Sequence, residues 1–236
     1  MNRPTYISEI KFTGELSHCG YLQEIPAIQH LAHTGSLPLS SPVTFFVGEN
    51  GTGKSTLLEA IAVSYGLNPE GGTRNFRFST KDTHSQLCEH LTLVKRDYAM
   101  DTFFLRAESF YNAATYMEEL GLTRGNFIHS QSHGESFLSI VQTFRGQGLY
   151  LLDEPEAALS PSRLLTLLLE LRNLTQHGAQ FIIATHSPIL MAFPGAQVLE
   201  FSHEGIHPVS YKDTENYKVT KQFLENPEKM LHYLFQ

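Results

Sequence analysis

The chain has 236 residues, of which 41% are hydrophobic and 17% charged, and its formal net charge is −7. This composition is typical of a globular protein with a sizeable core, and its acidic balance leaves nucleic-acid binding without support. The two cysteines exclude a disulfide framework, and no apolar run approaches the roughly 18 residues of a membrane span. We therefore expect a cytoplasmic protein without direct membrane insertion.

The first 42 residues predict a small β structure. Residues 6–12 alternate between apolar and polar side chains, which indicates a half-exposed strand, and residues 21–25 are its candidate partner strand. Residues 26–42 contain three prolines and predict a loop or a short helix.

The central motif of the chain lies within residues 43–60. Residues 43–47 predict a buried parallel strand, and a helix follows from about Lys54. Between them the sequence matches G-x-x-x-x-G-K-S/T, the loop that wraps the phosphates of a nucleotide. The residues expected to bind the nucleotide here are Gly48, Glu49, Asn50, Gly51, Thr52, Gly53, Lys54, Ser55 and Thr56.

The residue types of this loop suit phosphate chemistry. Glycines let backbone N–H groups approach an anion, and the helix N-terminus adds about half a positive charge. We expect Lys54 to reach the β- and γ-phosphates, Ser55 to offer its hydroxyl to Mg²⁺, and Thr56 to contact the α-phosphate.

Residues 66–136 carry weaker signals. Residues 66–83 predict a surface loop, 91–95 and 102–107 predict strands joined by a polar turn, and 110–120 predict a helix. Residues 131–136 are small and polar and precede an amphipathic helix, which fits either a second anion site at a helix N-terminus or an ordinary serine cap.

The last third of the chain places polar residues at the ends of two buried strands. Residues 148–152 deliver Asp153 and Glu154, which suit an Mg²⁺ ligand and a base for the attacking water. Residues 181–184 lead to His186, which can reach a γ-phosphate or that water from the same sheet edge.

Three further regions of the chain carry predicted elements. A leucine-rich helix begins at Pro161 and ends near Gly178, and residues 197–201 and 206–209 predict a β pair. Residues 216–236 predict one or two short helices, which pack either on the core or on a partner.

Together these motifs resemble the ABC-type ATPase domain. Residues 48–55 correspond to Walker A, residues 132–135 to the signature, residues 149–154 to Walker B, and His186 to the switch histidine. Among such AAA-family ATPases of the ABC class, the chain resembles small soluble ATPases akin to the SMC and Rad50 heads. The resemblance implies one α/β P-loop NTPase domain, residues 1–236, with a mostly parallel central sheet, an antiparallel β edge and a small helical subdomain at about residues 109–146.

The resemblance also implies roles for individual residues. Lys54, Glu154 and His186 would be catalytic, with Mg²⁺ as the cofactor of ATP; the metal ligands would be Ser55, Asp153 and, at the position of the usual glutamine, Glu108. Two chains would dimerise head to tail on ATP, and the signature would complete the partner's nucleotide site; the signature residues that bind nucleotide are Ser132, Gly134 and Glu135. His133 and Ser160 depart from the family pattern, and Tyr21 is either the adenine-stacking residue or a core residue.

Three functions follow from the resemblance. The first is ATP hydrolysis that switches the conformation of a partner protein, whose identity the sequence does not give. The second is the nucleotide-binding subunit of a membrane transporter, and the third is an ATP sensor with slow turnover in a defence or repair complex. Only 23 residues separate Glu108 from Ser132, too few for a long coiled-coil arm and short for a transporter-type helical subdomain.

Overall fold

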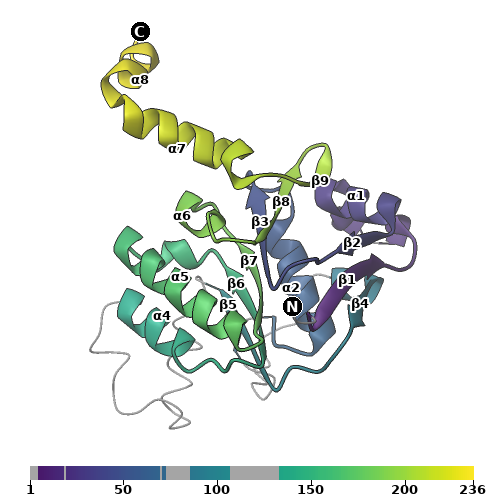
Figure 1. Cartoon of the computed structure of the whole chain (residues 1–236). Helices are drawn as coiled ribbons and strands as arrows, with labels where there is room; N and C mark the ends of the chain where they lie inside the picture. Colours follow the sequence, from purple (N-terminus) through teal and green to yellow (C-terminus); the bar gives the residue numbers. More distant parts are fainter. Residues whose placement is uncertain (1–4, 19, 70, 73–85, 107–132) are drawn as a thin grey trace.

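The computed structural model describes residues 5–18, 20–69, 71–72, 86–106 and 133–236 (Figure 1). Its main element is a six-stranded sheet with the order β5-β6-β7-β3-β8-β9, in which only β9 pairs antiparallel. The predicted mostly parallel sheet with an antiparallel β edge is confirmed. The strands are β3 (Val43–Gly48), β5 (Asp101–Arg106), β6 (Gly148–Asp153), β7 (Gln180–Ala184), β8 (Gln197–Ser202) and β9 (Gly205–Pro208).

The central strands are buried on both faces. Every residue of β6 and β7 and the first five residues of β3 are buried, as continuous apolar runs in a parallel sheet require. The strands predicted at 43–47, 148–152 and 181–184 are therefore confirmed.

A second, antiparallel sheet has the order β2-β1-β4 and consists of β1 (Ile7–Phe12), β2 (Ser36–Pro38) and β4 (Leu91–Lys95). The predicted pairing of residues 21–25 with the first strand is wrong, because this segment forms a 3₁₀ helix, η2 (Gly20–Glu24), in which only Leu22 is buried. The segments 91–95 and 102–107 are strands as predicted, but β4 and β5 belong to different sheets.

One buried side chain joins the two sheets. The amide of Gln180, at the start of β7, donates to Ile7 O at 2.8 Å and accepts from Ile7 N at 2.9 Å. Gln180 thus completes the backbone hydrogen bonds of a strand that belongs to the other sheet.

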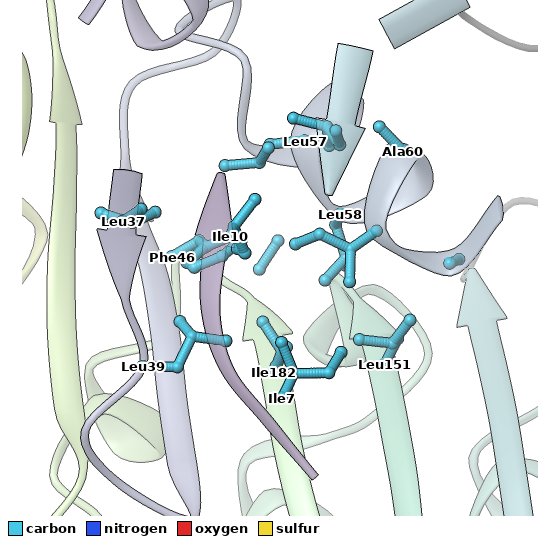
Figure 2. Packing of buried hydrophobic residues seen from close by; sticks show 14 of the residues in the cluster. Ile7, Ile10, Leu37, Leu39, Phe46, Leu57, Leu58, Ala60, Leu151 and Ile182 are labelled. Carbon is cyan, nitrogen blue, oxygen red and sulfur yellow. The ribbon is translucent and has the colours of Figure 1, made fainter. Parts of the chain in front are cut away.

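The helices cover both faces of the central sheet. One core cluster joins that sheet to α1 (Pro26–Thr34), α2 (Lys54–Tyr65) and the antiparallel sheet, as Figure 2 shows for Ile7, Ile10, Phe46, Leu57, Leu58, Leu151 and Ile182. The other cluster joins the opposite face to α4 (His133–Val141), α5 (Pro161–Gln176) and α6 (Pro188–Met191). Short 3₁₀ helices are η1 (Leu16–His18), η3 (Gln86–His90), η4 (Pro155–Ala157) and η5 (Tyr211–Asp213).

The C-terminal region is an arm made of two helices, α7 (Glu215–Glu225) and α8 (Pro227–Leu234), which extends from the body (Figure 1). The two helices bury none of their residues in this chain, and α7 contacts the body at α6. The predicted helix 110–120, most of the loop 66–83 and most of the predicted helical subdomain lie outside the described residues. Within the described part of the chain, no helix has the length and apolar character needed to cross a membrane.

Candidate functional site

The candidate site lies where three parallel strands end at one edge of the central sheet. β3 leads into the glycine-rich loop, β6 ends at Asp153, and β7, which lies between them, leads to His186. Backbone hydrogen bonds also join the ends of these strands, because Glu154 N donates to Ala184 O and Thr185 N donates to Phe46 O. The fold therefore gathers residues that are up to about 140 positions apart in the sequence, as expected for the carboxyl edge of an open α/β sheet.

The loop glycines are needed for different reasons. Gly48, Gly51 and Gly53 all have positive φ, at 125°, 79° and 103°. A Cβ on Gly48 would lie 2.0 Å from Phe201 O of β8, and one on Gly53 would lie 2.6 Å from Ile25 Cγ2. A Cβ on Gly51 would meet nothing within 4 Å, so this glycine serves the backbone conformation alone.

Lys54 lies under the loop and is only 5% exposed. Its ammonium donates to Gly48 O at 2.8 Å and to Glu49 O at 2.7 Å. Burial lowers the pKa of Lys54, while the carboxylates of Glu154, Asp153 and Glu156 act in the opposite direction. Because an ammonium has three N–H groups, two hold the loop and one can meet an anion in front of it.

Ser55 and Asp153 form a pair of oxygen ligands. Ser55 Oγ donates to Asp153 Oδ1 at 2.8 Å, and Asp153 is buried. Magnesium prefers octahedral oxygen ligands at about 2.0–2.1 Å, which places neighbouring ligands about 3 Å apart. The pair therefore fits Mg²⁺. Among the described residues no group of three or more His, Cys, Asp or Glu could hold a metal.

Arg106, the last residue of β5, is a site residue that the sequence analysis did not identify. Its Nη1 lies 2.7 Å from Glu59 Oε2 of α2, and its Nε lies 3.6 Å from Asp153 Oδ2. The guanidinium thus places a positive charge beside the proposed metal ligand. Its position at the end of a predicted strand, two residues before Glu108, was the signal available in the sequence.

Glu154 and His186 face each other across the end of β6 and β7. Glu154 has φ 49° and ψ 53°, and it is the one non-glycine residue with positive φ in the part of the chain that the structure describes. Its Oε1 lies 3.5 Å from His186 Nε2. A left-handed conformation costs on the order of 1–3 kcal/mol and concentrates at functional sites, so the strain supports a role for this carboxylate.

Two buried polar atoms at this place have no hydrogen-bond partner within the described residues: His186 Nε2 and Glu156 Oε2. The other oxygen of Glu156, in η4, accepts a hydrogen bond from His186 N. Unsatisfied buried polar atoms in a native structure indicate a missing ligand or water, so this part of the site is suited to bind a polar ligand.

Asn216, in the first turn of α7, also contacts His186. Its Nδ2 donates to His186 O at 3.0 Å and lies 3.3 Å from His186 Nδ1. Sequence reasoning missed Asn216 because it belongs to no motif and stands 30 positions after the histidine. It missed the role of Glu156, although an acidic residue two positions after Glu154 was visible.

The signature-like segment is described only in part, since Ser132 lies outside the described residues, as does the proposed metal ligand Glu108. Gly134, in the first turn of α4, would place a Cβ 2.9 Å from Ala158 O and 2.7 Å from Arg163 Nη1. Glu135 pairs with Arg163 at 2.9 Å. The start of α4 is therefore fixed against the loop after β6 and the first turn of α5.

The remaining nucleotide-binding candidates lie on the loop and the start of α2. Glu49 and Asn50 are exposed, Thr56 is half-buried, and the buried Thr52 donates to Glu49 O at 2.8 Å. Tyr21 is 68% exposed, which excludes the core alternative for this ring.

Two family models match the chain. Residues 28–104, which include the phosphate loop, match a family described as "AAA domain". Residues 136–192, which include Asp153, Glu154 and His186, match a family described as "AAA domain, putative AbiEii toxin, Type IV TA system".

Known proteins give weaker similarities. The xylose import ATP-binding protein XylG of Thermoanaerobacter pseudethanolicus is 25% identical over 189 residues, which cover 70% of this chain and 37% of that protein, so the match spans little more than a third of the relative. The SMC head domain from Thermotoga maritima has 15% identity and a TM-score of 0.48, with coverage of 87% of this chain and 99% of that one. The cbiO1 structure from Clostridium perfringens, part of the ABC transporter complex cbiONQ, has 15% identity and a TM-score of 0.47, with coverage of 99% and 100%.

Proposed function

We propose that this chain, whose sequence matches AAA-family domains and whose fold is that of a P-loop ATPase, binds ATP with Mg²⁺ and hydrolyses it to ADP and phosphate. The single observation that carries the proposal is the convergence of three groups at one sheet edge. These are the loop held by Lys54, the oxygen pair of Ser55 and Asp153, and the strained Glu154 facing His186.

Each group has a step in this reaction. Backbone N–H groups of the loop and Lys54 bind the β- and γ-phosphates, and Ser55 and Asp153 hold Mg²⁺. When bound, the metal neutralises charge that develops on the phosphate oxygens. Glu154 accepts a proton from the attacking water. Its carboxylate suits this role because it is partly exposed and lies beside His186 Nε2, which has no hydrogen-bond partner among the described residues. His186 then donates a hydrogen bond to the γ-phosphate.

We further propose that ATP joins two chains head to tail. In this arrangement Ser132, Gly134 and Glu135 of one chain complete the nucleotide site of the other, as the resemblance to ABC-type ATPases implies. The packing of Gly134 against Ala158 and Arg163 supports this proposal, because it links the signature helix to the loop that follows the catalytic carboxylate. Hydrolysis then separates the chains and switches a partner protein.

Two alternatives have a specific observation in their favour. The match to a xylose import ATP-binding protein favours the nucleotide-binding subunit of a transporter. The match to the family described with the AbiEii toxin favours an ATP sensor with slow turnover in a defence complex. Co-purification with an integral membrane protein would support the first alternative. A wild-type turnover no faster than that of the variant E154Q would support the second.

The test uses Glu154→Gln, which keeps the shape of the side chain and removes its basicity. We expect phosphate release to fall by about 10²- to 10⁴-fold. We also expect the mass in solution to change from monomer to dimer only with Mg·ATP. K54A is the control, because it should lose ATP binding and stay monomeric. An E154Q protein that binds ATP and remains monomeric would contradict the head-to-tail mechanism, and one that hydrolyses ATP at the wild-type rate would contradict the role of Glu154.

A further inference from the structure

His186 is held from two sides by side chains that belong to different elements. Glu156 of η4 accepts a hydrogen bond from His186 N, and Asn216 of α7 donates to His186 O at 3.0 Å. Both backbone polar groups of the histidine are therefore satisfied by side chains rather than by a sheet or helix. The position of its ring depends on these two residues.

We infer that Asn216 is a positioning residue that fixes His186 in the tautomer with its proton on Nε2, so that an N–H donor faces the nucleotide. The inference rests on the proposed function only for the identity of the group that this proton meets. The protonation state of the ring can be measured without ATP.

The hydrogen bonds of Asn216 determine its orientation. A carbonyl oxygen can only accept, so the group that contacts His186 O must be the NH₂ of the amide. The same NH₂ lies 3.3 Å from His186 Nδ1. Because an amide NH₂ has two hydrogens and accepts nothing, Nδ1 must present its lone pair, and the proton of the neutral imidazole then resides on Nε2.

The Nε2–H that results points into the site. His186 Nε2 is buried and has no hydrogen-bond partner among the described residues, and Glu154 Oε1 lies 3.5 Å from it. The carboxylates of Glu154 and Glu156 both face this histidine. A proton on Nδ1 would meet the N–H of the Asn216 amide, so the contact with Asn216 favours the form with the proton on Nε2.

The first turn of α7 is anchored well enough to hold Asn216 in place. Thr214, which is 1% exposed, caps the helix by accepting from Tyr217 N, and its hydroxyl donates to Tyr211 O at 2.7 Å. A pocket lined by Gly48, Glu49 and Asn216, among other residues, places this turn beside the phosphate loop. The arm is thus tied at its base to the residue that would contact the γ-phosphate.

The test uses the full chain with ¹⁵N-labelled histidine and no nucleotide. The signal of His186 is assigned by its loss in H186Q, and the ¹⁵N shifts of the ring show which nitrogen carries the proton. Asn216→Asp keeps the size of the side chain and replaces the NH₂ donor by an acceptor. Asn226→Asp is the matched control, because Asn226 caps α8 by accepting from Lys229 N, which an aspartate does equally well.

We expect the wild type and N226D to carry the proton on Nε2 alone, and N216D to carry it on Nδ1 or on both nitrogens. With Mg·ATP, we expect N216D to lower kcat about tenfold or more with little change in KM, because the contact matters most in the transition state. A wild-type ring with its proton on Nδ1, or an N216D ring that keeps the wild-type form, would overturn the inference. If the tautomer is as expected and the wild type hydrolyses no ATP, the proposed function fails and the inference about Asn216 stands.

Discussion

At the scale of single residues, the site combines one nearly buried cation with several carboxylates. Lys54 uses two of its hydrogens to hold the carbonyls of Gly48 and Glu49, and Arg106 lies beside Asp153. An isolated buried charge is costly, whereas opposite charges in the same place offset that cost. A triphosphate with its metal would enter a site whose charges are already arranged in matching positions.

The oxygen pair makes a prediction about metal dependence. Ser55→Ala removes one proposed Mg²⁺ ligand and leaves the loop glycines unchanged. We expect the Mg²⁺ concentration for half-maximal ATP hydrolysis to rise roughly tenfold or more. A Mg²⁺ titration of the ATPase rate measures this. Ser64→Ala is the control on the same helix, since Ser64 Oγ contacts Cys88 O at 3.2 Å rather than the site. An equal response in both variants would contradict the assignment of Ser55.

A prediction for Glu156 distinguishes the contribution of its hydrogen bond to activity from the contribution of its negative charge. Its carboxylate accepts from His186 N, and a glutamine keeps a carbonyl oxygen for this purpose whereas an alanine does not. We expect E156A to lower kcat about 10- to 100-fold by displacing His186, and E156Q to retain most of the activity. Steady-state phosphate release measures both. If the two variants lose activity equally, the negative charge of Glu156 matters and the hydrogen bond does not.

Residues with a motif could be predicted from the sequence, and residues without one could not. Lys54, Ser55 and Asp153 were predicted to lie at the same sheet edge. This prediction came from the spacing of the loop motif and from the position of Asp153 after a buried strand. Asn216 reaches the site through a tertiary contact with His186, and no local pattern reports such a contact.

At the scale of elements, the phosphate loop depends on how closely β3 approaches β8. Gly48 has φ 125° and pairs with Phe201, whose carbonyl oxygen would lie 2.0 Å from an added Cβ. Gly51, three residues later, also has a positive φ but faces open space. Gly48 is therefore required because a side chain would clash with β8, whereas Gly51 is required only for its backbone conformation.

This contrast predicts different stabilities for two alanine variants. We expect G48A to lose about 3 kcal/mol or more, because the ladder between β3 and β8 must shift, and G51A to lose about 1 kcal/mol from backbone strain. Since about 1 kcal/mol lowers the melting temperature by roughly 2–4 °C in a chain of this size, thermal unfolding distinguishes the two. Similar melting temperatures for both variants would show that the contact with Phe201 relaxes easily.

The strands that form continuous apolar runs were predictable from the sequence, and the prediction failed at one short segment without such a run. β3, β6 and β7 are continuous apolar runs, and such runs indicate a parallel sheet covered on both faces. The sequence of residues 21–25 predicted a strand because most of their side chains are apolar or long. In the structure only Leu22 of η2 is buried, and α1 begins at Pro26. Short segments of this kind carry too few positions to separate a strand from a helical turn.

At the scale of the whole molecule, the arm connects the proposed catalytic histidine to a surface outside the body. Asn216 ties the first turn of α7 to His186, and the helices beyond it expose large apolar side chains. These side chains are Val219, Phe223, Leu224, Leu231, Tyr233, Leu234 and Phe235. The sequence predicted helices here and left their location open, because an amphipathic helix pattern does not say which surface its apolar face will meet.

The arm has a base, which is the first turn of α7, and a tip, which is α8. The last prediction tests these two parts separately. Removing residues 226–236 deletes α8, which buries none of its residues in this chain, so we expect the melting temperature and the ATPase rate to remain at wild-type values. Removing residues 215–236 also deletes Asn216, and we expect kcat to fall as it does in N216D while the fold of the body persists. Thermal unfolding and phosphate release on the two truncated proteins measure this. A loss of ATPase activity on removal of α8 alone would mean that the tip of the arm, and not only its base at Asn216, controls His186.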